Sequence, residues 1–376
     1  MKVSCTQEQL TRGLSIVGRA VATRTTLPIT SNILLATDQS RLKLVATNLE
    51  IAISHWLPAM VEEEGAITVP ARLLIDFVNS LPNQRVDLSM ASGSRTVELK
   101  CARFQGRING IDAEEFPPIP TIGTGVMAKI SPQALRLAIT QVAFAAATDE
   151  ARPVLTGVHS EFEDAKLTLA AADGFRLAVH QATLASSVAE KVNVIIPAKA
   201  LAELHRLSED EEPVEITINP NKSQVLFHLK DIELVSQLIQ GTFPNYTQLI
   251  PKEYKTRAEM NLAEFAKATK TASIFAREGS AIIRLQIDPV EGNSGKVVMS
   301  ARAEEVGDNV GEVDAKVSGE AAKIAFNSKY LSDVLGVLRE ERVALEVTSP
   351  SSPGVIRPIG TDNYVHVVMP MFVQWQ

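Results

Sequence analysis

The sequence predicts an α+β fold in which one domain of about 125 residues occurs three times. A strand that breaks into a short helix runs from Val69 (VPARLLIDFVNSL), recurs from Ile196 (IPAKALAELHRL) and occurs in a fainter form from Phe326 (FNSKYLSDVLGVL). An amphipathic helix precedes each of these segments, and an alternating strand follows each short helix. A period near 127 residues is the length of a whole domain, not of a solenoid repeat. We therefore expect one domain fold, used three times.

Each copy is expected to open with a helix that buries one face. In the first copy, Leu14 and Val17 fall within about 40° of Leu10 at 100° per residue. Arg12 and Arg19 lie on the opposite side. The opening helices of the later copies repeat this apolar spacing, so we expect basic side chains on the outer face of each.

The segments between the helices alternate apolar and polar residues, as half-buried strands do. The clearest examples are 41–53, 166–179 and 296–306. Turn-forming residues at 91–95 (ASGSR) and 219–223 (NPNKS) predict hairpins. Each copy thus follows the order helix, strands, helix, strands, which predicts a sheet on one side and two helices on the other.

Two joints rich in Pro and Gly separate the copies, EEFPPIPTIGTG at 114–125 and GTFPNYTQLIP at 241–251. They predict domains at 1–120, 126–248 and 249–376. The first two domains would each be followed by a joint, and the last would end in the C-terminal tail.

Charge is divided unevenly between the expected helices and the rest of the chain. The whole chain has 37 Lys and Arg against 44 Asp and Glu, a net charge of −7. The six expected helices alone hold eleven basic residues and five acidic ones. This bias predicts a basic surface shared by the helices of an otherwise acidic protein. The helices are expected at 7–22, 71–80, 132–147, 198–207, 262–277 and 327–339.

The sequence offers no set of residues that would form a catalytic, metal or cofactor site. Cys5 and Cys101 are the only cysteines, and the six histidines show no metal-ligand spacing. The segment GTGVMA at 123–128 matches a dinucleotide fingerprint formally, but it opens no helix. No secretion signal and no membrane-spanning run is found, so we expect a cytoplasmic binding protein without an enzyme's active site.

Two hypotheses remain open from the residues themselves. The first is a nucleic-acid scaffold whose basic helices face the phosphate backbone without reading sequence. The second is a multidomain enzyme with a composite site between degenerate repeats. The first is favoured, because small side chains accompany Lys and Arg on the helices and only 12 Phe, 2 Trp and 4 Tyr are available for base stacking.

A set of short segments, found in a fixed order along the whole chain, points to a known family. They are TLPITSNILL (26–35), VPAR (69–72), EEFP (114–117), AADGFRLAV (171–179), FPNYTQLIP (243–251), FNSKYLSDVL (326–335), VIRP (355–358) and YVHVVMPM (364–371). In this order and at this spacing they resemble the bacterial sliding clamps, the β subunits of DNA polymerase III. The resemblance implies a homodimer closed head to tail into a six-domain ring around double-stranded DNA, with sheets outside and helices inside. It also implies a processivity factor, a non-catalytic subunit of the polymerase holoenzyme.

The resemblance also assigns residues to three surfaces. Ile274 and Phe275 are expected at the dimer interface, where Ile274 lies opposite the core face of its helix. The candidate DNA contacts are Arg24, Arg72, Arg152, Lys199 and Arg206. For Arg152, an interdomain salt bridge is an equal alternative.

A hydrophobic pocket between the second and third domains is implied for short linear motifs of the replicative polymerase, the clamp loader, other polymerases and mismatch-repair proteins. Methionines suit such an adaptable surface, although each could instead pack in the core. Pro370 is expected to end strand pairing and leave Met371 free to line the pocket. The tail after Met371 is expected to be a disordered end rather than a cover for the pocket rim. The pocket residues are Leu155, Gly174, Phe175, Arg176, Leu177, Pro244, Leu249, Asn327, Tyr330, Val367, Met369, Pro370 and Met371.

Overall fold

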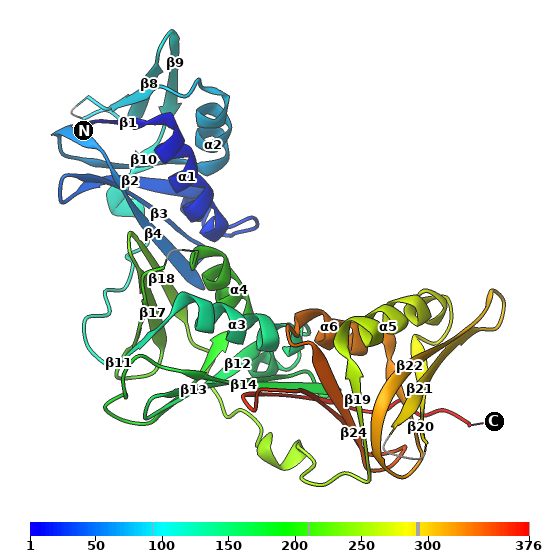
Figure 1. The fold of residues 1–376 in the computed structure, drawn as a ribbon. Coiled ribbons are helices and arrows are strands. Elements are labelled where there is room, and N and C mark those ends of the chain that lie inside the picture. The colour runs from blue at the N-terminus through cyan, green and yellow to red at the C-terminus, as the bar shows by residue number, and fades with distance from the viewer. Residues whose placement is uncertain (92, 210, 291–293, 376) are drawn as a thin grey trace. The chain divides into compact units, whose positions relative to one another are not determined.

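The computed structural model describes residues 1–91, 93–209, 211–290 and 294–375 (Figure 1). Contacts between residues divide the chain into two units, and each is described separately below. Unit 1 comprises 1–132, 184–190 and 199–238, and unit 2 comprises 133–183, 191–198 and 239–376. The first copy of the repeat belongs to unit 1 and the third to unit 2, while the second copy is shared between them.

The first copy has two helices and ten strands, and a side-chain cap starts its first helix. The hydroxyl of Thr6 accepts a hydrogen bond from the backbone N–H of Gln9, which satisfies one of the free donors at the start of α1. The elements are β1 (Lys2–Thr6), α1 (Gln7–Val17), β2 (Asn32–Asp38), β3 (Arg41–Thr47), β4 (Ile51–Pro58), β5 (Met60–Glu63), β6 (Ala66–Pro70), α2 (Ala71–Ser80), β7 (Arg85–Ser89), β8 (Thr96–Cys101), β9 (Phe104–Asn109) and β10 (Ile111–Asp112).

The second copy repeats this order with eight strands. Strands β11 and β16–β18 lie in unit 1, and β12–β15 lie in unit 2. The elements are β11 (Val126–Ile130), α3 (Pro132–Val142), β12 (Gly157–Glu163), β13 (Lys166–Ala172), β14 (Arg176–Thr183), β15 (Val192–Pro197), α4 (Ala198–Leu207), β16 (Val214–Ile218), β17 (Gln224–Leu229) and β18 (Ile232–Gln237).

The third copy lies wholly in unit 2, and asparagine caps begin both of its helices. Asn261 accepts from the N–H of Glu264, and Asn327 accepts from the N–H groups of Lys329 and Tyr330. The elements are β19 (Thr256–Asn261), α5 (Leu262–Arg277), β20 (Ile282–Pro289), β21 (Ser294–Ala303), β22 (Gly307–Gly319), β23 (Ala322–Asn327), α6 (Ser328–Val337), β24 (Arg342–Val347), β25 (Gly354–Pro358) and β26 (Tyr364–Val368).

The sheets join each copy to the next by an antiparallel strand pair. In unit 1, β4 of the first copy pairs with β18 of the second. In unit 2, β14 of the second copy pairs with β26 of the third in the equivalent way. These junctions create a nine-stranded sheet in unit 1, beside a five-stranded one, and a twelve-stranded sheet in unit 2.

Helices cover one face of the sheets, as the periodicity predicts (Figure 1). In α1, Leu10, Leu14 and Val17 are buried, while Arg12 and Arg19 are exposed. Helix α5 shows the same division, because Phe265 is buried and its Lys and Arg side chains are exposed. The α+β fold and its threefold repeat are confirmed, and the six helices occupy the expected segments, with short 3₁₀ turns ending α1 and α3.

The Pro- and Gly-rich joints are each held by one buried aromatic side chain. Phe116 packs against Ile29 and Val45 in unit 1. Phe243 stacks on His159 in unit 2, with ring centroids 5.4 Å apart, and meets Tyr246 edge-on. The hairpin predicted at 91–95 joins β7 to β8, although Ser92 lies outside the described residues.

Candidate nucleic-acid and partner interfaces

Basic side chains from two copies meet on the helices of unit 1. Arg19, at the end of α1, lies 3.7 Å from the carboxylate of Glu203 on α4. Arg206 also pairs with Glu203, so one acid is shared by two arginines. Lys199 and Arg12 are exposed on the same two helices. The structure thus places Arg206 beside Arg19, and Lys199 lies two turns before Arg206 on the same exposed face of α4. These side chains can contact phosphate groups without reading base edges.

The other three predicted DNA contacts are exposed residues on other segments of the chain. Arg24 is exposed in the loop after α1. Arg72 has a side chain that is 97% exposed and lies 3.8 Å from Asp76 one turn later. Arg152 donates a hydrogen bond of 2.9 Å to the carbonyl of Asp173, within its own copy. That contact is local, so it gives no support to the interdomain salt bridge considered for Arg152.

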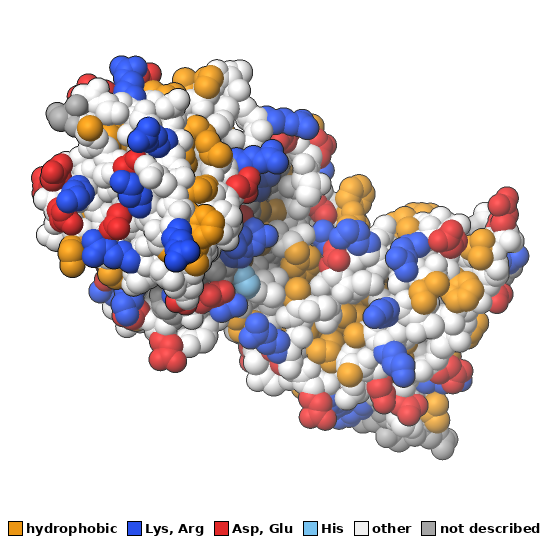
Figure 2. All heavy atoms as spheres, turned by 90° about the horizontal axis from the view of Figure 1, so that it is seen from above, with side chains coloured by type: hydrophobic (Ala, Val, Ile, Leu, Met, Phe, Trp, Pro, Cys, Tyr) orange, Lys and Arg blue, Asp and Glu red, His pale blue; other side chains and the backbone are white. Residues whose placement is uncertain are grey.

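The helices of the third copy carry basic residues on their exposed face in the same way. Lys267, Lys270 and Arg277 stand on α5, and Lys329 stands on α6, where it pairs with Asp333 at 2.6 Å. Figure 2 shows Lys and Arg side chains spread over the helix-bearing face of unit 2, with exposed apolar side chains among them. All three copies therefore contribute basic helix surface.

Arg176 organises the junction between the second and third copies in unit 2. Its guanidinium bonds to the carboxylates of Asp173 at 3.0 Å and Asp333 at 2.7 Å, and to the carbonyl of Phe144 at 2.8 Å. It also lies over the ring of Tyr330, 4.6 Å from the centroid. Only 9% of Arg176 is exposed, so this is a buried cation held by two carboxylates, and removing it would leave Asp173 without a cation and Asp333 with only its lysine on α6.

Two buried histidines lie at the same junction. His180 on β14 bonds to Gln141 at 2.7 Å, and burial lowers its pKa to about 4. His366 on β26 stacks on Phe144, and burial lowers its pKa to about 3. The hydroxyl of Tyr364 is 3.3 Å from Nδ1 of His366, while Nε2 has no partner among the described residues. Burial therefore favours the neutral form of both imidazoles.

An exposed apolar surface adjoins this junction. Phe175 is 56% exposed and stacks on Tyr330, with centroids 6.3 Å apart. The amide of Met369, itself 43% exposed, donates to the carbonyl of Phe175 at 2.8 Å. Leu249, 55% exposed, is next to Ile250, which packs on the buried cluster beneath. We call Phe175, Leu249, Tyr330 and Met369 the apolar junction surface.

The remaining pocket residues support this surface or flank it. Leu177 and Val367 are buried in the cluster under it. Gly174 has a φ of +96°, and a Cβ there would come within 2.9 Å of Arg152, so the turn at Asp173 requires glycine. Asn327 caps α6 just before Tyr330. Leu155 is half-buried and Pro244 is exposed.

One expectation about the C-terminal tail is wrong, namely that it forms a disordered end. Strand β26 ends before Met369, as expected, and the amide of Met371 donates to the carbonyl of Ala325 on β23 at 2.7 Å, while Met371 as a whole is half-buried. Trp375 is half-buried, with its indole 5.6 Å from Nζ of Lys323. The tail does not follow the pattern of a disordered end, because the edge of β23 offers it a backbone acceptor and a cation. Phe372 stands 96% exposed between these anchors.

Two strand edges occupy the places in the repeat of the strands that pair at the junctions between copies. Within the described chain, neither edge has a partner strand. Residues Gly307–Asp314 of β22 pair only with β21, and β9 pairs only with β8. Exposed apolar side chains accompany each edge. Ile274, Val306 and Val310 are more than half exposed near β22, where half-buried Phe275 approaches Gly307, and Leu73 and Phe104 are similarly exposed near β9.

Chemistry of other kinds is not indicated by the described residues. No group of three or more His, Cys, Asp or Glu there could hold a metal ion. Cys5 and Cys101 are buried and free, on strands separated by β7. Among the same residues, no helix is long and apolar enough to cross a membrane.

Three family models, all for domains of the DNA polymerase III beta subunit, match the chain. The N-terminal domain model matches residues 1–120, the central domain model 129–245 and the C-terminal domain model 247–372. Together they cover nearly the entire length.

Curated relatives and solved structures agree with these models. The chain is 34% identical to a "Beta sliding clamp" of Synechococcus elongatus, over 99% of each chain, and 33% identical to that of Staphylococcus aureus, over 94% of each. The fold matches the DNA polymerase sliding clamp of Bacillus subtilis with a TM-score of 0.94, at 30% identity over all of both chains. A Pseudomonas aeruginosa sliding clamp, solved bound to griselimycin, matches with a TM-score of 0.91 at 28% identity, over 99% of this chain and 100% of that one.

Proposed function

Because the chain belongs to the family of bacterial DNA polymerase III β subunits, the sliding clamps, we propose that two copies close head to tail into a ring around duplex DNA. The ring would tether the replicative polymerase, so that synthesis is processive. As a clamp, the chain is a processivity factor with no active site of its own. The observation that carries the proposal is the pair of unmatched edges on β22 and β9.

The repeat explains how the ring would close. Strand β4 of the first copy pairs with β18 of the second, and β14 of the second pairs with β26 of the third. If every copy pairs with the next in this way, β22 of the third copy would pair with the equivalent strand of a following copy. That strand is β9, which has a free edge. A second chain supplies it, and exposed apolar side chains beside both edges would be covered by the contact.

The basic helices would face the DNA in the hole. Lys199, Arg206, Arg24, Arg72 and Arg152 would bind phosphates through side chains that carry no sequence information. Topology would retain the DNA, so individual contacts need only be weak. The acidic remainder of the chain would discourage DNA from binding elsewhere.

The apolar junction surface would receive short linear motifs. An exposed Met, Leu and Phe beside a rigid buried network suit a hydrophobic motif, because the thioether adapts its shape while the surroundings stay fixed. Candidate partners are the replicative polymerase, the clamp loader, other polymerases and mismatch-repair proteins. We place the clamp domains at 1–120, 126–248 and 249–376 and the site of action in the cytoplasm.

The solution mass tests ring closure. Light scattering at micromolar concentration should give about 81 kDa, twice the chain mass of 40.7 kDa. Phe104→Asp on β9 should shift the mass toward that of one chain, because a carboxylate would be buried against β22. Phe372→Asp is the matched control, since it changes an exposed aromatic residue away from both edges. A wild-type mass of about 41 kDa, or equal masses for the two variants, would contradict this closure.

A further inference from the structure

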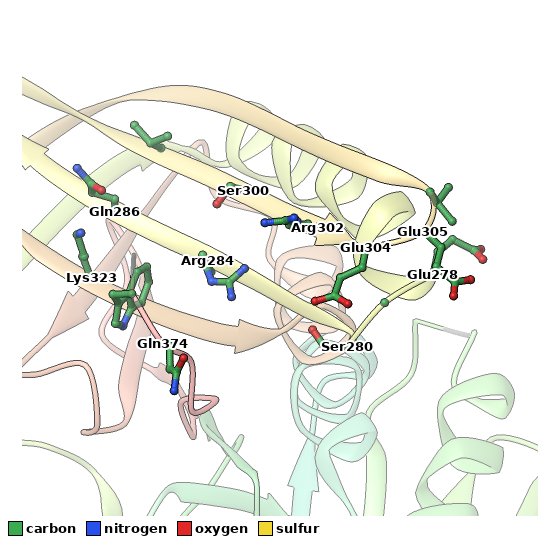
Figure 3. Close-up of a pocket in the computed structure, with 14 residues that line it drawn as sticks. Glu278, Ser280, Arg284, Gln286, Ser300, Arg302, Glu304, Glu305, Lys323 and Gln374 are labelled. Atoms are coloured by element: carbon green, nitrogen blue, oxygen red, sulfur yellow. The ribbon is translucent and has the colours of Figure 1, made fainter.

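Three basic side chains form a diagonal row across the sheet of unit 2, on the face opposite α5. Arg284 on β20 is opposite Ala325 of β23 and Ser300 of β21. Lys323 lies two residues before Ala325, and Arg302 lies two residues after Ser300, so all three side chains emerge on one face. Lys323 and Arg302 are displaced from Arg284 in opposite directions along β20, so the three side chains lie on one straight line. Figure 3 shows the three side chains in this order.

The row is unpaired, unlike its neighbours. Among the residues that the structure describes, no carboxylate forms an ion pair with Arg284, Arg302 or Lys323. Elsewhere in the third copy, Lys296 pairs with Glu312 at 2.8 Å, and Arg357 pairs with a carboxylate in the same manner. The chain as a whole has more acidic than basic residues. These three adjacent cations have no ion-pair partner among the described residues, so they create a local positive potential on an otherwise acidic protein.

A hollow of about 870 Å³ lies over the row (Figure 3). Gln286, Ser280 and Ser300 line it with hydrogen-bonding groups. Trp375 bounds it at the Lys323 end, where the indole contacts the ammonium group. At the other end, beyond Arg302, the lining is negatively charged, because three glutamates lie there, Glu278, Glu304 and Glu305.

We propose that this row is a docking site for an extended, acidic segment of a partner protein, with carboxylates at alternate residues. Diagonal neighbours in a sheet stand about 7–8 Å apart. Alternate side chains of an extended peptide stand about 6.6–6.8 Å apart. Three carboxylates at positions i, i+2 and i+4 can therefore each meet one cation of the row.

The glutamates at the far end limit the segment and define its charge pattern. A fourth carboxylate at i+6 would meet Glu304, so the segment ends there or continues with a neutral or basic residue. The same acids argue against a nucleic acid, whose charge continues at every phosphate. Trp375 is the single aromatic side chain among the described residues that line the hollow, whereas single strands are usually bound by several stacking residues. This site goes beyond the clamp function proposed above, because it uses neither the apolar junction surface nor the helices.

Peptide binding tests the site. A fluorescein-labelled peptide with Asp and Ser alternating over five residues should bind the full-length protein and be displaced by salt. Arg284→Ala should weaken it about tenfold, the expected loss for a hydrogen bond between charged groups. Lys296→Ala is the matched control, because Lys296 lies on β21 with its side chain on the same face but outside the hollow. Its affinity should match wild type.

A second peptide tests the spacing. With the same three Asp placed consecutively, successive carboxylates point to opposite faces of an extended chain, so binding should be several-fold weaker. The fluorescence of Trp375 shows whether the peptide binds at this hollow. In a Trp56→Phe variant Trp375 is the only tryptophan, so its emission should change as unlabelled alternating peptide is added. Met369→Ala should bind this peptide normally, which separates the site from the apolar junction surface.

Any one of four results would overturn the proposal. In the first two, the alternating peptide does not bind, or the peptide with consecutive Asp binds equally well. In the other two, Arg284→Ala and Lys296→Ala lose peptide affinity equally, or an oligo-dT strand binds this row in place of the peptide.

Discussion

Lowering the pH from 7 to 5 should destabilise unit 2 by about 4 kcal/mol through His180 and His366. His180 lies on β14 and His366 on β26, both imidazoles are buried, and burial lowers the pKa to about 4 for His180 and about 3 for His366. Strand β26 leads directly into Met369, so loss of this junction should also remove the apolar junction surface.

The sign and size follow from proton binding. An unfolded histidine has a pKa near 6.5, so the unfolded chain binds more protons than the folded chain at any pH from about 6.5 down to the folded pKa. Stability from these residues is therefore complete above pH 6.5 and falls as the pH falls. The free energy of unfolding changes by up to about 1.4 kcal/mol per pH unit for each histidine, which gives a loss of about 2 kcal/mol each between pH 7 and 5.

Urea unfolding at pH 7, 6 and 5 measures this loss. Trp375 emission in a Trp56→Phe background reports unit 2. His366→Phe keeps the stacking on Phe144 but cannot titrate, so its loss of stability between pH 7 and 5 should be about half that of the parent. The variant should also be less stable at pH 7, because the hydroxyl of Tyr364 loses its partner.

His228→Gln is the control, since that histidine has a side chain 47% exposed on β17. It should retain the full loss between pH 7 and 5. The reasoning is refuted if His366→Phe and the parent lose equal stability over this range.

Two further predictions concern partner and DNA binding. Met369→Ala should weaken a polymerase tail peptide about tenfold, because a half-exposed methionine would bury the rest of its apolar area on binding; Phe372→Ala is the control, and unchanged affinity in Met369→Ala would exclude it from the pocket. Replacing both Lys199 and Arg206 with Ala should reduce the slope of log K against log salt on duplex DNA by about 2, one per phosphate contact. Exposed Lys166 on β13 is the control, and an unchanged slope in the double variant would remove both residues from the DNA surface.

The repeat and the helix faces could be predicted because they depend on local periodicity. Leu10, Leu14 and Val17 are buried, and Arg12 and Arg19 are exposed, as a 3.6-residue period requires. Ile274 is exposed for the same reason, since it is opposite the buried face of α5. The tight turn at Asp173 and Gly174 was also predictable, because glycine accepts a positive φ.

Interactions between distant segments could not be predicted in this way. Arg176 and Asp333 are 157 residues apart, and nothing in either segment indicates their ion pair. The pairing of Met371 with β23 depends on a strand edge that exists only after the sheet forms. Similarly, the row of Arg284, Arg302 and Lys323 requires the register of three strands. One usable signal was missed, the apolar Leu73 on the outer face of its helix, which marks the edge at β9.

Retention on circular DNA tests the central claim most directly. The protein should be loaded onto a nicked circular duplex with a clamp loader, separated from free protein at 0.5 M salt, and then compared before and after the circle is linearised. A closed ring is held by topology, so it should remain on the circle at high salt and slide off the linear form. Equal retention on both forms would show binding by affinity, and it would contradict the encircling ring.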